Sequence, residues 1–167
     1  MVSDKKKVVM VCEDELELLE LYSKVLELRY DVIKVCSGYD CINKYLEQKS
    51  KGANIDLLFL DYKLGDMLGD AVAKKIKELN GIKIILLSAY NLDEPIKKDL
   101  LENRYIEKFL QKPIKMRQII QEAIEVICWE MVILPIYETY YFKIAPNNVD
   151  FFWIDKFLVE VFSLNLI

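Results

Sequence analysis

Short apolar runs alternate with amphipathic helical patterns through most of this chain, and that alternation limits the folds open to it. Several of the runs are apolar without interruption, as expected for strands that are buried on both faces. We predict strands at residues 8–12, 32–35, 57–60, 82–87 and 106–110. The clearest helical faces consist of Leu18, Leu19, Tyr22, Val25 and Leu26, of Val72, Ile76 and Leu79, and of Ile119, Ile120, Ala123, Ile124 and Ile127.

Five strand-helix units within residues 1–127 predict an α/β fold, a doubly wound five-stranded parallel sheet with helices on both faces. The functional groups of such sheets lie beyond the carboxyl ends of the strands, near the point where the strand order reverses. The residues that follow the predicted strands are therefore the first candidates for a site. They are Glu13 and Asp14 after the first strand, Asp61 after the third, Ser88 after the fourth and Lys112 near the end of the fifth.

Three of these residues, Glu13, Asp14 and Asp61, are acids that we expect to converge at one edge of the sheet. Two like charges about 4 Å apart repel by about 4 kcal/mol at an effective dielectric constant near 20, so the cluster needs a cation. Carboxylates without histidine or paired cysteine favour Mg²⁺ or Mn²⁺ over zinc. Asp14 as the N-cap of the next helix would explain one carboxylate but not three. Lys112 and the Ser88 hydroxyl add a positive charge and a donor, which suits a phosphoryl group on a carboxylate.

Four segments resemble the receiver domain of two-component response regulators, each at a predicted strand end and in the order found in that family. They read VVMVCEDE, DLLFLDYKLGDMLGD, IILLSAY and KFLQKPI. The resemblance covers residues 5 to about 127, and it implies a flavodoxin-like fold with strand order 2-1-3-4-5. It also implies a signalling switch rather than an enzyme, one that catalyses at most its own phosphorylation and dephosphorylation.

The resemblance gives a role to the acids and to the lysine at the predicted site. It implies that Asp61 is the phospho-acceptor and that Glu13 and Asp14 bind the metal together with it. The backbone carbonyl of Lys63 would complete the protein ligands of the Mg²⁺ or Mn²⁺ cofactor. Lys112 would pair with the phosphoryl group.

The same resemblance implies residues that respond to phosphorylation. Ser88 would move to bond the phosphoryl group, and Phe109 occupies the aromatic switch position. Ala89 is small, as the family requires for access to the phosphoryl group. Pro113 is expected to follow a cis peptide bond.

Two side chains are best placed to admit or exclude the water that would hydrolyse an aspartyl phosphate. They are Lys63 and Tyr90, two residues beyond Asp61 and Ser88, and both are bulky. We therefore expect slow self-dephosphorylation. The sequence departs from the family pattern at Gly65, where a proline is usual, and at Glu13, where aspartate is commoner.

The implied function is a phosphorylation-activated switch that accepts its phosphoryl group from a sensor histidine kinase or a histidine phosphotransfer protein and signals to a downstream protein target. A phosphorylation-independent interaction module on the same fold remains an alternative, which only phosphorylation of Asp61 would distinguish. A phosphatase with an aspartyl nucleophile would need a second carboxylate where this chain has Lys63. A flavodoxin-type flavin protein is disfavoured, because residues 13–15 are acids where its phosphate cradle would lie.

The composition excludes several other classes of protein. The 167 residues allow one domain and a modest extension, and the net charge of −4 gives no field that would attract nucleic acid or an anionic membrane. The absence of histidine excludes a Ser/His/Asp triad and imidazole metal sites.

The chain has no signal-peptide pattern, so we expect a cytoplasmic protein. Its cysteines have no CxxC spacing, and we expect buried, reduced thiols at Cys12, Cys36, Cys41 and Cys128.

Residues 128–167 differ in composition from the expected receiver domain at 1–127, since aromatic and aliphatic side chains dominate them. The segment is too short and too acidic for a helix-turn-helix output domain. Charged residues recur within each window of about 18 residues, which disfavours a membrane span. We expect this hydrophobic C-terminal extension to form a dimerisation element of a homodimer. Docking on the receiver or on a membrane surface are the alternatives.

Overall fold

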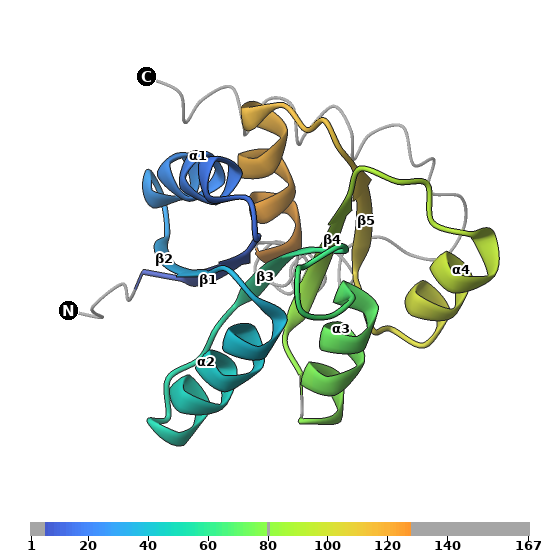
Figure 1. Cartoon of the computed structure of the whole chain (residues 1–167). Coiled ribbons are helices and arrows are strands. Elements are labelled where there is room, and N and C mark those ends of the chain that lie inside the picture. Colours follow the sequence, from blue (N-terminus) through green and yellow to red (C-terminus); the bar gives the residue numbers. More distant parts are fainter. Residues whose placement is uncertain (1–5, 80, 128–167) are drawn as a thin grey trace, which may run out of the picture. The chain divides into compact units, whose positions relative to one another are not determined.

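The computed structural model describes residues 6–79 and 81–127, which form a five-stranded sheet with helices on both faces (Figure 1). All neighbouring strands are parallel, and their order is β2-β1-β3-β4-β5. This confirms the predicted α/β fold and its strand order. The strands are β1 (Val8–Cys12), β2 (Asp31–Val35), β3 (Leu57–Asp61), β4 (Lys83–Ser88) and β5 (Lys108–Gln111).

The helices divide between the two faces of the sheet and create two separate cores (Figure 1). Alternate side chains of a strand enter different cores, as the two-residue period of a strand requires: Leu58 and Leu60 of β3 lie in one and Leu57 and Phe59 in the other. Helix α1 and the helical residues 116–127 cover the core of Phe59, while α2, α3 and α4 cover the core of Leu60. The bounds are α1 (Leu16–Glu27), α2 (Gly38–Ser50), α3 (Gly69–Glu78) and α4 (Glu94–Glu102).

The observed strands differ from the predicted ones mainly at their ends. Strand β5 begins at Lys108 and not at Ile106. The N–H of Ile106 donates to the Leu100 carbonyl over 3.2 Å, so this apolar residue closes the end of α4 before the strand begins. Strands β3 and β4 each extend to the polar residue that follows the apolar run, Asp61 and Ser88.

Some side chains are more exposed than the sequence pattern indicates. Leu18 and Val25 in α1 are half-buried at the flank of a helix whose buried face includes Leu19 and Leu26. The expectation that the cysteines are buried is wrong for Cys36, which is exposed because it lies in the connection between β2 and α2.

Cys12 and Cys41 are buried free thiols, whereas Cys128 lies outside the described residues. The expected dimerisation element at 128–167 lies outside them as well. Within the described part of the chain, no helix has the length and apolar character needed to span a membrane.

Candidate functional site

The candidate site lies where the chain connections diverge, at the carboxyl ends of β1 and β3. Strands β1 and β3 are neighbours in the sheet. From β1 the chain continues to β2, toward one edge of the sheet, and from β3 it continues to β4, toward the opposite edge. Their connecting helices, α1 and α3, cover opposite faces of the sheet, and doubly wound sheets place their sites at such a point. Glu13 follows β1 directly, and Asp61 is the last residue of β3. The hydrophobic strands therefore bring two acids from distant parts of the sequence to one edge.

Three carboxylates gather at this edge, as the sequence predicts. Each of Glu13, Asp14 and Asp61 offers a carboxylate oxygen, and these oxygens lie within 4.8 Å of one another. Glu13 and Asp61 are only 2% and 5% exposed, whereas Asp14 is exposed. All three donors are hard oxygen ligands, and one side of the group is open to solvent, which fits Mg²⁺ or Mn²⁺ with bound waters.

Lys112 reaches into the acid cluster from the segment after β5. Its Nζ lies 2.6 Å from Oε2 of Glu13 and 2.6 Å from Oδ1 of Asp61. Burial lowers the pKa of Lys112, but the hydrogen bonds to Asp61 and Glu13 outweigh that effect, so its pKa is raised and it stays charged. The Lys112–Pro113 peptide bond is cis, as the resemblance implies.

Glu13 has a perturbed pKa because it is buried among other acids. Burial raises the pKa of this carboxyl group to about 7, and the negative charges of Asp61 and Asp14 add to the rise. The hydrogen bond from Lys112 opposes it. A divalent cation at this site would favour the ionised form of Glu13, so metal binding and proton release are linked here.

The loop after β3 binds the Asp61 carboxylate through a backbone N–H group. The backbone N–H of Lys63 donates to Oδ2 of Asp61 over 2.8 Å. The loop closes through a bridge between Lys63 and Leu68, and α3 then begins at Gly69. A Cβ at Gly69 would lie 2.5 Å from the Asp61 carbonyl oxygen, so only glycine allows this approach. The sequence analysis does not single out Gly69 as a residue that the site needs.

Ser88 ends β4 next to the cluster and is 1% exposed. Its Oγ accepts a hydrogen bond from the N–H of Tyr90 over 3.0 Å, and it also lies 3.0 Å from the Tyr90 carbonyl oxygen, to which it can donate. The hydroxyl is thus held by its own turn. Ala89 between them is exposed.

Two lysine-aromatic contacts lie near the predicted switch and access residues. Nζ of Lys63 is 5.2 Å from the ring centroid of Tyr90, so the two predicted access residues contact each other. Phe109 is half-buried, and Nζ of Lys97 lies 5.3 Å from its ring centroid.

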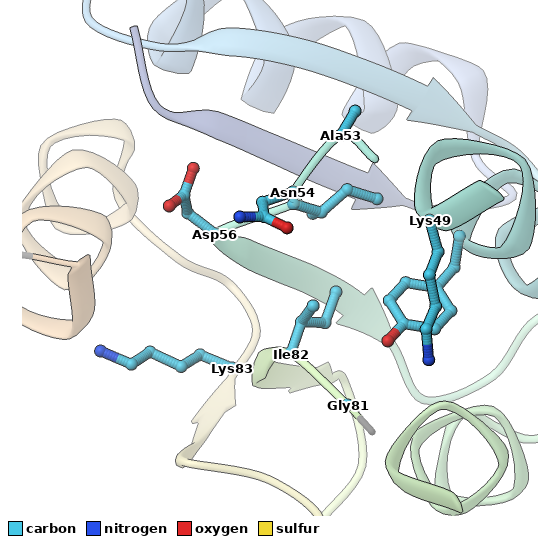
Figure 2. A pocket seen from close by; sticks show the side chains of 9 residues that line it. Lys49, Ala53, Asn54, Asp56, Gly81, Ile82 and Lys83 are labelled. Carbon is cyan, nitrogen blue, oxygen red and sulfur yellow. The ribbon is translucent and has the colours of Figure 1, made fainter. Parts of the chain in front are cut away.

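A separate pocket of about 350 Å³ lies at the other end of the sheet (Figure 2). Its lining includes Asp56 before β3 and Ile82 and Lys83 at the start of β4, so it is at the amino ends of these strands. Lys49, on its α2 side, contacts the Leu79 carbonyl oxygen. This pocket is therefore not part of the acid cluster.

Comparison with known proteins agrees with this geometry. The family model of the response regulator receiver domain matches residues 9–124. The chain is 32% identical over 120 residues to hybrid signal transduction histidine kinase L of Dictyostelium discoideum. That match covers 66% of this chain but only 7% of the relative's length.

Solved structures of receiver domains share the fold. The signal receiver domain of a protein described as a Luxo repressor, from Vibrio parahaemolyticus, has a TM-score of 0.66 and 25% identity, and the match covers 76% of this chain and 94% of that one. A CheY-like receiver domain from Methanospirillum hungatei JF-1 has a TM-score of 0.64 and 21% identity, with 77% and 98% covered. The family model, which matches most of the chain, and the strand-end acids lead to one conclusion. The chain belongs to the response regulator receiver domain family of two-component signalling.

Proposed function

We propose that this protein is a signalling switch that accepts a phosphoryl group on Asp61 from a histidine kinase or a histidine phosphotransfer protein. In this step a carboxylate oxygen of Asp61 forms a bond to phosphorus. The bond between phosphorus and the donor's imidazole nitrogen breaks, and the nitrogen keeps the electron pair. The observation that carries the proposal is the contact of the buried Asp61 carboxylate with the Lys112 ammonium over 2.6 Å, in a cluster whose third acid, Asp14, is exposed.

The residues of this chain supply position and charge for that step. Attack by a carboxylate on a phosphoryl group brings negative charges together, so positive charge must collect around the transferred oxygens. Lys112 supplies one such charge, and the Lys63 N–H orients the attacking carboxylate. Mg²⁺, which receiver domains bind at an acidic pocket, would supply the rest and would be held by Glu13, Asp14, Asp61 and the backbone carbonyl of Lys63.

The signal would leave the site through Ser88 and Phe109. Ser88 is held by the Tyr90 backbone over 3.0 Å, and a phosphoryl group on Asp61 offers its hydroxyl stronger, charged acceptors. A Ser88 side chain that turns toward those acceptors leaves space that the half-buried Phe109 ring can enter. A downstream protein target would read this change at the surface.

Receiver domains interact with histidine kinases or phosphotransfer proteins, and the similar region of the Dictyostelium discoideum relative belongs to a hybrid histidine kinase. Two other functions fit the sequence less well. A phosphatase would need a second carboxylate at position 63, and the structure has there a lysine whose Nζ lies over Tyr90. A phosphorylation-independent module gives no reason for a buried lysine held between Glu13 and Asp61.

Incubation with acetyl phosphate and Mg²⁺ tests the proposal directly. We expect intact-mass analysis to show one added phosphoryl group, and hydroxylamine, which cleaves acyl phosphates, to remove it. A protein that stays unmodified with this donor and with a phosphorylated phosphotransfer protein would favour the phosphorylation-independent module.

The lifetime of the phosphoryl group should depend on Lys63 and Tyr90. Their side chains contact each other two residues beyond Asp61 and Ser88, and we expect this contact to hinder the approach of water and to slow self-dephosphorylation. The double variant Lys63→Ser/Tyr90→Ser should lose its phosphoryl group about tenfold faster, which corresponds to about 1.4 kcal/mol of activation free energy. Decay of the adduct after removal of the donor measures this rate.

Lys74→Ser provides a matched control for that experiment. Lys74 lies over the Tyr105 ring at 5.6 Å and pairs with Asp99 of α4, so it makes the same kind of contact elsewhere on the protein. Its substitution should leave the decay rate unchanged. Equal decay rates of the wild type and the double variant would show that these side chains do not shield the phosphoryl group.

Residues 128–167 would act as a dimerisation element of a homodimer. Their dense aromatic and aliphatic composition calls for a covering surface, since monomers seldom expose apolar patches larger than a few hundred Å². We expect light scattering to give a dimer for the full chain and a monomer for a chain that ends at Ile127. A monomeric full chain would contradict this role, and a truncated chain that remains dimeric would place the interface on the receiver.

A further inference from the structure

The first N–H groups of α2 are bound by a carboxylate from another part of the chain. The Gly38 N–H donates to Oδ1 of Asp66 over 2.9 Å, and the Tyr39 N–H donates to Oδ2 over 2.8 Å. Asp66 lies five residues beyond Asp61, in the loop between β3 and α3. Hydrogen bonds from Tyr39 and then Gly38 lower the pKa of Asp66, so this carboxylate is charged at neutral pH.

The start of α2 and this loop also pack closely. A Cβ at Gly38 would lie 2.4 Å from Cγ of Met67 and 2.8 Å from Cγ2 of Val72. A larger residue at the first position of α2 would therefore displace the half-buried Met67 side chain and Val72. The two hydrogen bonds of Asp66 and this packing hold the loop against the helix from two adjacent positions.

The inner side of the same loop holds the phospho-acceptor. The Lys63 N–H binds Oδ2 of Asp61, the Gly69 N–H donates to the Tyr62 carbonyl over 2.7 Å, and Lys63 pairs with Leu68. The segment from Lys63 to Leu68 is thus one closed unit, and Asp66 lies within it. A displacement of Asp66 would move the backbone that orients the Asp61 carboxylate.

The loop has little stiffness of its own next to Asp66. Gly65 precedes it, and glycine has the largest backbone freedom of any residue. Within residues 6–79 and 81–127, no hydrogen bond from the Gly65 N–H is found, and a Cβ there would meet only Oδ2 of Asp14 at 3.7 Å. The Gly65 φ angle is not positive. Position 65 could therefore hold a residue with less backbone freedom. In this chain the loop depends instead on the contacts that Asp66 and Met67 make with α2.

We propose that Asp66 is a positioning residue: by holding the β3–α3 loop on the N-terminus of α2, it keeps Lys63 and the Asp61 carboxylate in the geometry that binds the divalent cation. This inference rests on the proposed function, since it assigns a support to that site. A loop that is ordered beforehand loses less conformational entropy when the ion binds. Groups that support metal ligands in this way affect affinity without touching the ion.

Three variants separate this role from a general stabilisation of α2. Asp66→Ala removes both hydrogen bonds to the helix. Ser37→Ala is the matched control, because Ser37 Oγ accepts from the Asp40 N–H over 3.1 Å and so caps the same helix by a bond within its own first turn. Asp66→Ala/Gly65→Pro stiffens the loop from within, since proline restricts the backbone and the Gly65 N–H is not needed.

Two measurements are made on each variant. Calorimetric titration gives the dissociation constant for Mg²⁺, and amide hydrogen exchange by NMR in the absence of metal gives the protection of the Lys63 N–H. We expect Asp66→Ala to weaken Mg²⁺ binding on the order of tenfold and to lower the protection of Lys63. Ser37→Ala should change neither value, and the added Gly65→Pro should restore most of both.

Two results would overturn the role of Asp66. One is an equal loss of Mg²⁺ affinity in Ser37→Ala and Asp66→Ala, and the other is an Asp66→Ala variant with unchanged protection of Lys63. If the wild type itself binds no Mg²⁺, the proposed function fails, while the exchange of the Lys63 amide in metal-free protein still decides whether Asp66 positions the loop. Asp66→Asn, which keeps one acceptor oxygen, replaces the alanine variant if that variant does not fold.

Discussion

The Asp61→Asn variant should form no phosphoryl adduct with acetyl phosphate and Mg²⁺, although it should fold like the wild type. The amide has nearly the shape of the carboxylate, but it has no anionic oxygen to attack phosphorus. The substitution also removes one of three acids that lie within 4.8 Å, which lessens their repulsion. We therefore expect the loss of the adduct in intact-mass analysis, with a thermal unfolding midpoint within a few degrees of the wild type.

Asp70→Asn gives the matched control for this variant. Asp70 lies in the first turn of α3, close in sequence to Asp61, but it is not part of the acid cluster. The same chemical change at this position should leave the adduct at the wild-type level. A full adduct on Asp61→Asn would show that another side chain is the acceptor, and peptide mapping would then identify it.

Removal of divalent cations should lower the rate of adduct formation by about a hundredfold or more. A bound cation stabilises the charge of the transition state by several kcal/mol, and each 1.4 kcal/mol corresponds to about a factor of ten in rate. Addition of EDTA should lower the rate to this level, and an excess of Mg²⁺ or Mn²⁺ should restore it. The rate of adduct formation, followed by mass at a series of metal concentrations, gives the measurement.

Asp14→Asn and Glu15→Gln separate the metal site from general negative charge. Both acids are exposed and adjacent, but only Asp14 belongs to the cluster. Asp14→Asn should require more Mg²⁺ for the same rate, whereas Glu15→Gln should follow the wild-type curve. Adduct formation that continues unchanged in EDTA would contradict a metal-assisted reaction at this site.

The sequence predicts the fold well because β1, β3 and β4 are buried along almost their whole length. Such strands read as continuous apolar runs, and their positions differ from the observed ones by at most two residues. The error at the start of β5 arises because Ile106 is apolar for a different reason: its side chain is buried in the core of Leu60, while its backbone N–H bonds to Leu100 at the end of α4. No apolar face is predicted for α4 either, and Leu100 is its one buried residue.

The sequence also predicts which residues gather at the site, but not how they are held. Glu13, Asp61 and Ser88 could be found because each is the first polar residue after an apolar run. The contacts of Lys112 with both Glu13 and Asp61 could not be predicted, because they depend on the paths of side chains from three strand ends. Asp66 gives no signal in the sequence, since the N–H groups that it binds are separated from it by the whole of α2 and β3.

Two of the site residues, Asp61 and Ser88, belong to the strands themselves, and this limits where movement can occur. Asp61 is in register with Leu87, and Ser88 is in register with Gln111, so both continue the ladders that the buried strands form. A shift of either backbone would break strand pairing in the core, which is the part of a protein that opens least often. We therefore expect the strands to keep their positions when the site changes state. A change that a partner could detect would involve side-chain rotations and the loops after each strand.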